Sequence, residues 1–243
     1  APVQLRPGNT ATEVALRTLS EALARQACAE LQIDFSEIMA EFRPAINTDG
    51  VAGLEAEIFL YDTLSGGAGF CKQLPSIGHA LLGNALSLLK ECRGNCDSSC
   101  YRCLRNFRNK IDHSVLDRHL GAWLLEHALT GELPIFNASR LEKSTNRLFE
   151  DLIRQKITGI KFHRDVKFSL PTGGSVQAPI AVERGGSLAS IIGLTVPLAN
   201  TVFADAALRA GMVGVDAAKA ILIDELVVQK SLAKATEQVL SRI

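Results

Sequence analysis

Aromatic residues, net charge and long apolar runs are scarce in this 243-residue sequence, and each shortage excludes a class of protein. Aromatic side chains make up 5% of the chain, so the core must consist of leucine, isoleucine, valine and alanine. The 26 lysines and arginines balance 26 aspartates and glutamates, which excludes a uniformly basic nucleic-acid binder but allows a local basic patch. No stretch approaches the roughly 18 apolar residues of a membrane helix, so we expect no membrane association.

Targeting signals and catalytic motifs are also missing. The first residues lack the charged and apolar regions of a secretory signal, so we expect a cytoplasmic protein. The chain does not begin with methionine, and we expect it to be processed or to be a fragment of a longer polypeptide. It contains no G-x-x-x-x-G-K-[ST], D-E-x-H or G-x-S-x-G motif. We therefore predict no catalytic residues and no ATP hydrolysis by this chain alone.

Six cysteines are present, and four of them lie close together. Cys92, Cys96, Cys100 and Cys103 form the pattern C-x3-C-x3-C-x2-C. Such near neighbours cannot link distant parts of a secreted chain, so the pattern favours a metal site over a disulfide scaffold. Four thiolates hold Zn²⁺ tetrahedrally and leave no position for water, which predicts a structural zinc ion. A four-iron iron–sulfur cluster and free or redox-active thiols are the alternatives.

Basic and aromatic side chains lie among the cysteines and just after them. Six basic and three acidic residues between positions 93 and 118 give this segment a local charge of +3. Arginine beside a rigid metal knot suits phosphate, and aromatic rings can stack on bases. The predicted DNA contacts are Arg93, Tyr101, Arg102, Arg105, Phe107, Arg108 and Lys110. The alternative is that the arginines neutralise the thiolates and form an ordinary charged surface.

His113 is a possible replacement for one cysteine ligand, although it lies ten residues past Cys103. A lone histidine at such a position is more typical of a helix cap or of the protein surface.

A glycine-rich turn, SGGAGF, follows a predicted strand and precedes a predicted helix. The N–H groups of such a turn can hold phosphate, which makes Gly66, Gly67 and Gly69 candidate DNA phosphate contacts. The turn lacks the P-loop lysine and the full G-x-G-x-x-G spacing. A tight turn with positive φ angles is therefore the favoured interpretation.

Hydrophobic periodicity predicts an α+β protein. Helical spacing is found at residues 13–33, 77–91, 115–129, 139–156 and 226–242. Strands are predicted at residues 34–46 and 54–64, within 161–186, and at 190–198, with a turn at 47–53 and mixed signals at 214–223. Asp112 or Ser114 is the predicted N-terminal cap of the third helix.

A change of composition at residues 130–138 divides the chain into two predicted domains. Residues 1–133 are predicted to form a helix-rich domain with a short sheet and a four-cysteine zinc knot. Residues 134–243 are predicted to form a smaller α/β domain of unknown role.

The second domain contains scattered carboxylates, which allow a metal-dependent nuclease of restriction-endonuclease type as an alternative function. These residues are Asp165, Glu183, Asp205, Asp216, Asp224 and Glu225. Residues 181–184 and 223–225 only loosely resemble the nuclease motif, and no convincing E-x-K pair is present. A solvated acidic surface is the favoured interpretation.

The cysteine segment resembles a known family. Residues 103–109 read C-L-R-N-F-R-N, residues 113–118 read H-S-V-L-D-R, and residues 61–70 read YDTLSGGAGF. Together these motifs resemble the zinc-binding MZB domain found at the C-terminus of superfamily 2 DNA helicases, over about residues 10–130. Lys110 departs from that pattern, in which glutamine follows the asparagine.

The resemblance implies an accessory role beside two motor lobes that hydrolyse ATP. It also implies that the partners are DNA and the helicase motor domains of the same polypeptide or complex, in DNA repair or antiphage defence. A protein-interaction scaffold that uses zinc only for folding is the remaining alternative.

Overall fold

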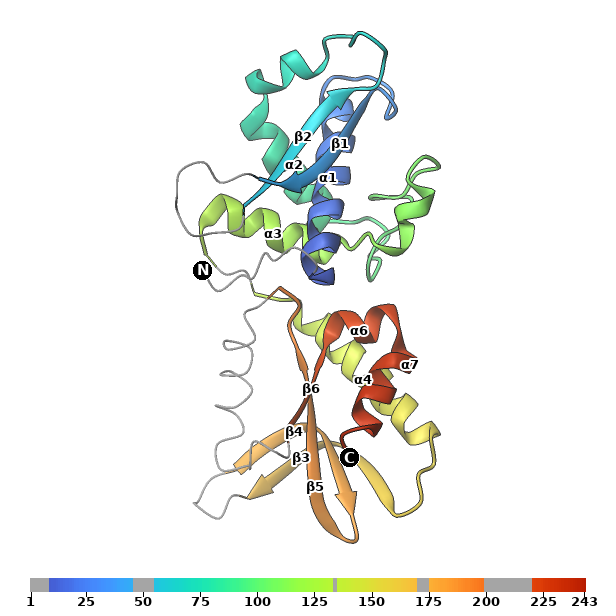
Figure 1. The fold of residues 1–243 in the computed structure, drawn as a ribbon. Helices are drawn as coiled ribbons and strands as arrows, with labels where there is room; N and C mark the ends of the chain where they lie inside the picture. The colour runs from blue at the N-terminus through green and yellow to red at the C-terminus, as the bar shows by residue number, and fades with distance from the viewer. Residues whose placement is uncertain (1–8, 46–54, 133–134, 170–174, 199–219) are drawn as a thin grey trace. The chain divides into compact units, whose positions relative to one another are not determined.

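The structure is a computed structural model that describes residues 9–45, 55–132, 135–169, 175–198 and 220–243 (Figure 1). The chain divides into two compact units, with an N-terminal unit that ends at Phe136 and a C-terminal unit that starts at Asn137. The predicted α+β class is confirmed, because each unit combines helices with a sheet and the four cysteines cluster in the first. The predicted domain boundary, between residues 133 and 134, lies outside the described residues.

The N-terminal unit packs helices around a two-stranded antiparallel sheet. Its elements are α1 (Thr10–Glu30), β1 (Ile38–Pro44), β2 (Ala56–Asp62), the 3-10 helix η1 (Cys71–Ser76), α2 (Gly78–Lys90), the 3-10 helix η2 (Lys110–Ser114) and α3 (Arg118–Thr130). Helix α1 contacts α2, α3 and both strands, so it forms the centre of the unit. Alanines at positions 15, 22 and 27 of α1 are fully buried, which lets these neighbours approach closely. The turn predicted at residues 47–53 lies outside the described residues.

The cap of α3 differs from the prediction. Residues 110–114 form the separate helix η2, so neither Asp112 nor Ser114 stands at the start of α3. Asp117 is the cap, and its buried carboxylate accepts hydrogen bonds from the N–H groups of His119 and Leu120. The prediction was wrong because the sequence does not show where one short helix ends and the next begins.

We expect Gly121→Ala to destabilise the contact between α1 and α3. A Cβ atom at Gly121 would lie 2.7 Å from Cγ2 of Thr18. Thr18 cannot turn away freely, because its hydroxyl accepts a hydrogen bond of 2.9 Å from the N–H of Asp117. Overpacking costs about 1–3 kcal/mol and alanine regains about 0.5–1 kcal/mol of helix propensity, so a net loss of about 1–2 kcal/mol is expected.

Urea unfolding followed by the fluorescence of Trp123, the single tryptophan of the chain, measures this change in the N-terminal unit. The matched control is Gly83→Ala in α2, where an added Cβ meets no atom within 4 Å. This control is expected to be neutral or stabilising. An equal response of the two variants would contradict the packing argument.

In its described residues, the C-terminal unit packs three helices against a four-stranded sheet. Its elements are α4 (Ala138–Arg154), β3 (Ile160–Ser169), β4 (Ser175–Arg184), β5 (Ser187–Thr195), β6 (Ala220–Asp224), α6 (Glu225–Lys230) and α7 (Leu232–Leu240). The strand order is β3-β4-β5-β6, with antiparallel pairs except for the parallel pair of β5 and β6. The core joins Leu148 and Leu152 of α4 to Ile180, Ile192 and other apolar residues of the sheet and of α7.

One predicted element of this unit is corrected, and a second, which the sequence left undecided, is partly described. The single closing helix at residues 226–242 is two helices, because Ser231 has an extended backbone (φ −153°) and its side chain accepts from the N–H of Lys234. The mixed segment at residues 214–223 contains strand β6 from Ala220 onward, and its first part lies outside the described residues. No helix among the described residues is both long enough and apolar enough to cross a membrane.

Candidate metal centre

The four sulfur atoms of the knot lie within 4.8 Å of one another. Cys92 Sγ lies 3.6 Å from Cys100 Sγ and 3.7 Å from Cys96 Sγ, and Cys103 Sγ lies 3.7 Å from Cys96 Sγ and 3.8 Å from Cys100 Sγ. A tetrahedron of thiolates with bonds of about 2.3 Å to one Zn²⁺ has edges of ~3.8 Å. In a four-iron cluster each cysteine binds a different iron, which holds the sulfurs further apart. The donor set and its spacing therefore fit a single tetrahedral ion.

Tight local turns bring the thiols together. The N–H of Gly94 lies 3.3 Å from Cys92 Sγ, and the N–H of Cys100 lies 3.2 Å from Cys103 Sγ. A Cβ atom at Gly94 would lie 3.1 Å from Cys100 Sγ, so a side chain there would crowd the knot. Asn95 adopts a left-handed conformation with φ of 41°, which asparagine tolerates in a turn.

The thiols differ in their readiness to ionise. Burial opposes ionisation of Cys92, but the N–H groups of Gly94 and Cys96 and the neighbouring thiols outweigh it and lower its pKa to about 6. Burial and the nearby Cys103 raise the pKa of Cys96, and burial raises that of Cys103. Like charges this close cannot all form without a cation among them, so the whole set would ionise only around a bound metal ion.

Arg118 holds the knot to the end of α2. Its Nε donates to the carbonyl of Cys96 at 2.9 Å, and its Nη1 donates to the carbonyls of Leu89 and Lys90 at 2.9 and 3.0 Å. Its own backbone N–H donates to Ser98 O at 2.7 Å. Arg118 is buried, so it is a structural residue and not part of an exposed basic surface.

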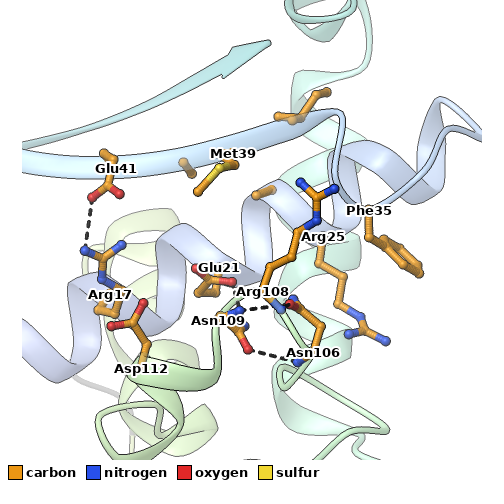
Figure 2. Close-up of a pocket in the computed structure, with 13 residues that line it drawn as sticks. Arg17, Glu21, Arg25, Phe35, Met39, Glu41, Asn106, Arg108, Asn109 and Asp112 are labelled. Atoms are coloured by element: carbon orange, nitrogen blue, oxygen red, sulfur yellow. Dashed lines mark hydrogen bonds and ion pairs between the residues drawn. The ribbon is translucent and has the colours of Figure 1, made fainter. Parts of the chain in front are cut away.

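The asparagines of the C-L-R-N-F-R-N motif fix the chain after the last cysteine (Figure 2). The buried amide of Asn109 donates to Leu104 O at 2.9 Å and to Glu21 Oε2 of α1 at 2.8 Å. Its Oδ1 accepts from the N–H of Asn106 at 2.9 Å. Nε2 of His113 lies 2.9 Å from the carbonyl oxygen of Asn106, so this histidine stabilises the loop after the knot and is not a fifth member of the cysteine cluster. The polar residues Asn106, Asn109 and His113 thus build the support of the knot.

Most of the predicted DNA contacts lie on the surface of the unit. Tyr101 is 65% exposed and Phe107 is 85% exposed. The exposed cations beside them are Arg93, Arg102, Arg108 and Lys110. Arg105 differs, because it is half-buried and its Nε donates to Ser99 Oγ at 2.9 Å. Sequence reasoning missed Ile111, which is 91% exposed although its residue type indicated a core position.

The glycine-rich turn already holds an anion of its own chain. Gly66, Gly67 and Gly69 all have positive φ angles, between 74° and 89°. The N–H of Gly69 donates to Asp62 Oδ2 at 2.6 Å, and the N–H of Cys71 donates to Asp62 Oδ1 at 2.9 Å. These donors, led by Cys71, lower the pKa of Asp62. A DNA phosphate would have to displace this carboxylate. The tyrosine–aspartate pair before the turn was the sequence signal that could have revealed it.

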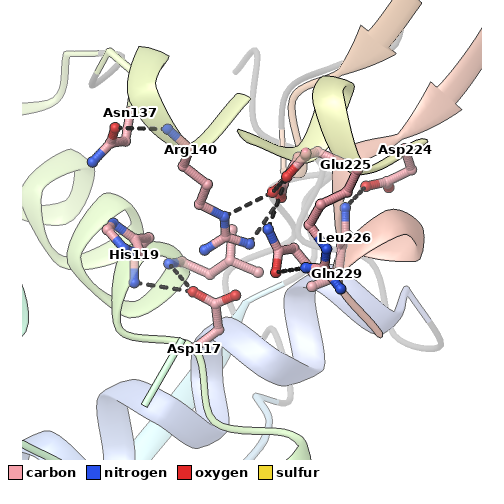
Figure 3. A network of polar contacts seen from close by, with 11 residues as sticks. Asp117, His119, Asn137, Arg140, Asp224, Glu225, Leu226 and Gln229 are labelled. Carbon is pink, nitrogen blue, oxygen red and sulfur yellow. Dashed lines mark hydrogen bonds and ion pairs between the residues drawn. The ribbon is translucent and has the colours of Figure 1, made fainter. Parts of the chain in front are cut away.

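The four described candidate carboxylates of the C-terminal unit have partners within the chain, and Figure 3 shows those of Asp224 and Glu225. Asp165 is exposed and pairs with the neighbouring Arg164. Glu225 accepts from Nε and Nη2 of Arg140, both at 2.8 Å. Glu183 lies 2.8 Å from Nε2 of His163, and Asp224 caps α6 through the N–H of Leu226. Asp205 and Asp216 lie outside the described residues. In the part of the chain that the structure describes, the four cysteines are the only metal-binding group of three or more residues. The nuclease alternative gains no support from these residues.

Comparison with known proteins matches the cysteine region to a family. Residues 19–104 match the sequence model of MZB, described as the MrfA Zn-binding domain. The Druantia protein DruE of Escherichia coli (strain UMEA 4076-1) is 43% identical over 126 residues, which is 50% of this chain and 7% of that protein. The solved structure titled "Crystal Structure of DUF1998 helicase MrfA bound to DNA" is 21% identical, with a TM-score of 0.36, and the match covers 51% of this chain and 15% of that chain.

The matched region is therefore a small part of both relatives. The family match spans α1 from residue 19 onward, both strands, α2 and the four cysteines. The resemblance inferred from the motifs is thus confirmed: residues 19–104 of this chain are similar to the MrfA Zn-binding domain of the MZB family.

Proposed function

We propose that this chain is an accessory region of a DNA helicase, folded around a structural zinc ion and contacting DNA through the surface of its cysteine knot. The ligands of the ion are Cys92, Cys96, Cys100 and Cys103. Four thiolates leave no position for water or substrate, so the ion supplies rigidity and takes no part in catalysis. The second proposed partner is the pair of motor lobes that hydrolyse ATP. The family resemblance supports a cytoplasmic role in DNA repair or antiphage defence.

The observation that carries this proposal is that the polar residues among and after the cysteines form two groups, one bonded within the protein and one exposed. In the first group, the side chains of Asn109, Arg118 and the half-buried Arg105 donate hydrogen bonds to other residues of the chain. Arg102, Arg108 and Lys110 are exposed, and none of them makes an ion pair among the described residues. A rigid support that presents unpaired cations suits the phosphate backbone, because the ordering of the segment is already complete before DNA binds.

The exposed apolar residues of the same surface support a second contact. Tyr101, Phe107 and Ile111 project large apolar areas into solvent. Rings can stack on unpaired bases, whereas an aliphatic side chain such as Ile111 is more suited to a protein surface. Ile111 therefore favours a contact with the motor lobes at the edge of the DNA-binding surface. The scaffold alternative would use the same contact.

We expect the triple variant Arg102→Ala/Arg108→Ala/Lys110→Ala to weaken DNA binding by removing phosphate contacts. Each contact to single-stranded DNA contributes about 0.7 to the slope of log K against log salt, so the slope is expected to fall by up to ~2. Fluorescence anisotropy of a labelled oligonucleotide over a series of salt concentrations measures this slope with zinc-loaded protein.

The control carries Lys72→Ala/Lys167→Ala/Lys234→Ala, which removes three exposed lysines outside the knot. Its net charge equals that of the test variant, so a general charge effect would change both alike. An identical salt slope in the wild type and the knot variant would argue for the protein scaffold instead of DNA contact.

A further inference from the structure

A pocket of about 120 Å³ lies between α1, the start of β1 and the segment that follows the knot (Figure 2). Its lining joins residues that are distant in sequence, such as Arg25 on α1, Met39 on β1 and Arg108 after the knot. A cavity of roughly 150 Å³ holds a benzene-sized ring, so this pocket has room for about one planar ring. Neither the cysteine motif nor the family resemblance pointed to it.

One end of the pocket is cationic and aromatic. Figure 2 shows Phe35, Arg25 and Arg108 at this end. Phe35 is 51% exposed, and the guanidinium carbon of Arg25 lies 4.9 Å from the centroid of its ring. Arg25 and Arg108 form no ion pair among the described residues. This end therefore offers two guanidinium groups and an aromatic face to a ligand.

The other end offers hydrogen-bond acceptors. Oε2 of Glu21 accepts a hydrogen bond from the amide of Asn109, and its second oxygen has no hydrogen-bond partner in the described part of the chain. The Asp112 carboxylate likewise accepts no hydrogen bond from any described residue. The cation at this end, Arg17, is already paired with Glu41 at 3.0 Å. The acceptors at this end are thus available to a ligand that donates.

We propose that this α1–β1 pocket binds one nucleotide of single-stranded DNA, with the base inside and its phosphate on Arg25 and Arg108. The proposal rests on the proposed DNA contact and extends it from the knot surface to α1 and β1. The phosphate of a nucleotide is anionic and matches the end with the two arginines. The base is a ring with N–H donors and matches the end with the two carboxylates. A cationic side chain of a protein partner would also suit Glu21 and Asp112, but the two arginines would repel it.

The pocket also selects the strand and the base. A base in a duplex is stacked and paired, so only an unstacked base of a single strand can enter. Cytosine and adenine carry an exocyclic amino group that donates to carboxylates, and guanine donates through N1 and N2. Thymine has no amino group, and its one base-edge donor, N3–H, lies between two carbonyl oxygens that carboxylates repel, so it suits these acceptors less well.

Binding of labelled dC and dT oligonucleotides of about 12 nucleotides to the zinc-loaded chain tests this proposal. We expect dC to bind about fivefold or more tightly than dT, which is the discrimination of one good base contact. Asp112→Asn and Glu21→Gln keep the shape of the pocket but replace a carboxylate oxygen with a donor. Each is expected to reduce the ratio of dC to dT affinity toward one, while the Trp123 unfolding transition stays unchanged.

Arg25→Ala is expected to weaken binding of both oligonucleotides about tenfold, the loss of one charged hydrogen bond. The matched control is Arg43→Ala on β1, because Arg43 also lies over an aromatic ring, at 5.6 Å from the centroid of Phe59. This control removes the same charge and the same type of ring contact. We expect it to change affinity by less than about twofold.

The outcomes separate this proposal from the proposed function. If the triple knot variant loses affinity while Arg25→Ala and Asp112→Asn bind like the wild type, the DNA contact stands and the pocket proposal is wrong. If free dCMP binds as tightly as the oligonucleotide, the pocket takes a free nucleotide and not a strand. If the wild type binds no single-stranded DNA, both proposals fail.

Discussion

Cys96→Ser is expected to reduce bound zinc from about one ion per chain to nearly none and to unfold the knot. Cys96 Sγ lies 3.7 Å from the sulfurs of both Cys92 and Cys103, so its removal takes one of the four ligands and leaves the ion open to water. Structural zinc supplies about 10–16 kcal/mol of binding free energy in zinc-finger peptides at neutral pH, and this energy is coupled to folding. The variant is therefore expected to lose far more stability than a typical surface substitution.

The damage should extend beyond the cysteines because of Arg118. This buried guanidinium bridges the carbonyls of Cys96, Leu89 and Lys90. If the knot opens, Arg118 loses its bonds to the carbonyls of Cys96 and Ser98, so the knot no longer braces the junction between the end of α2 and the start of α3. The unfolding midpoint reported by Trp123, which lies in α3, is therefore expected to fall together with the zinc content.

Elemental analysis, a visible absorption spectrum and urea unfolding followed by tryptophan fluorescence measure these effects. Cys71→Ser is the matched control, since Cys71 is a half-buried thiol outside the knot and is expected to leave the zinc content unchanged. About four irons per chain with a broad visible band would overturn the zinc assignment in favour of an iron–sulfur cluster. Full zinc content in Cys96→Ser would show that the ion is held elsewhere.

The knot itself could be predicted from sequence because its ligands are close along the chain. The spacing of four cysteines over a few turns restricts where the thiols can go, and no distant segment has to be known. The same holds for the helices with strong periodicity, such as α1 and α4. These elements depend on local spacing, which one sequence displays directly.

The support of the knot could not be predicted, because it depends on partners far away in sequence. Arg118 looked like one more surface cation, and only the fold shows its bonds to the end of α2. Asn109 meets Glu21, which lies 88 positions earlier. Tertiary contacts decide which arginines and asparagines are structural and which are exposed. The sequence alone does not distinguish the two groups.

Glu225, the first residue of α6 directly after β6, illustrates the same limit in the C-terminal unit. A carboxylate after a strand suits a metal-dependent nuclease as well as a structural ion pair. The fold distinguishes them, since Glu225 has no exposed surface and receives donors from Arg140 and Ser144. Ser144 Oγ also accepts from Nε2 of Gln229 at 2.8 Å, which links α4 to α6.

Glu225→Ala is accordingly expected to destabilise the C-terminal unit by about 3–5 kcal/mol, because it removes the carboxylate that pairs with the buried Arg140 guanidinium. Far-UV circular dichroism during urea unfolding follows this unit. The Trp123 transition reports only on the N-terminal unit and should not move. The control is the exposed ion pair in which Nη2 of Arg154 lies 3.6 Å from Oε2 of Glu150. Glu150→Ala is expected to lower the free energy of unfolding by less than about 0.5 kcal/mol.

The double variant Arg140→Met/Glu225→Leu separates a structural role from a catalytic one. Replacing a buried ion pair by apolar residues of similar size is often neutral or stabilising by about 1–4 kcal/mol, so the double variant should recover the stability that Glu225→Ala loses. DNA binding through the knot should also survive in it. Mg²⁺-dependent DNA cleavage by the wild type that disappears in this stable double variant would instead establish Glu225 as a nuclease ligand. Because the Glu225 carboxylate is already paired with the Arg140 guanidinium and accepts a hydrogen bond from the Ser144 hydroxyl, we expect no cleavage in either protein.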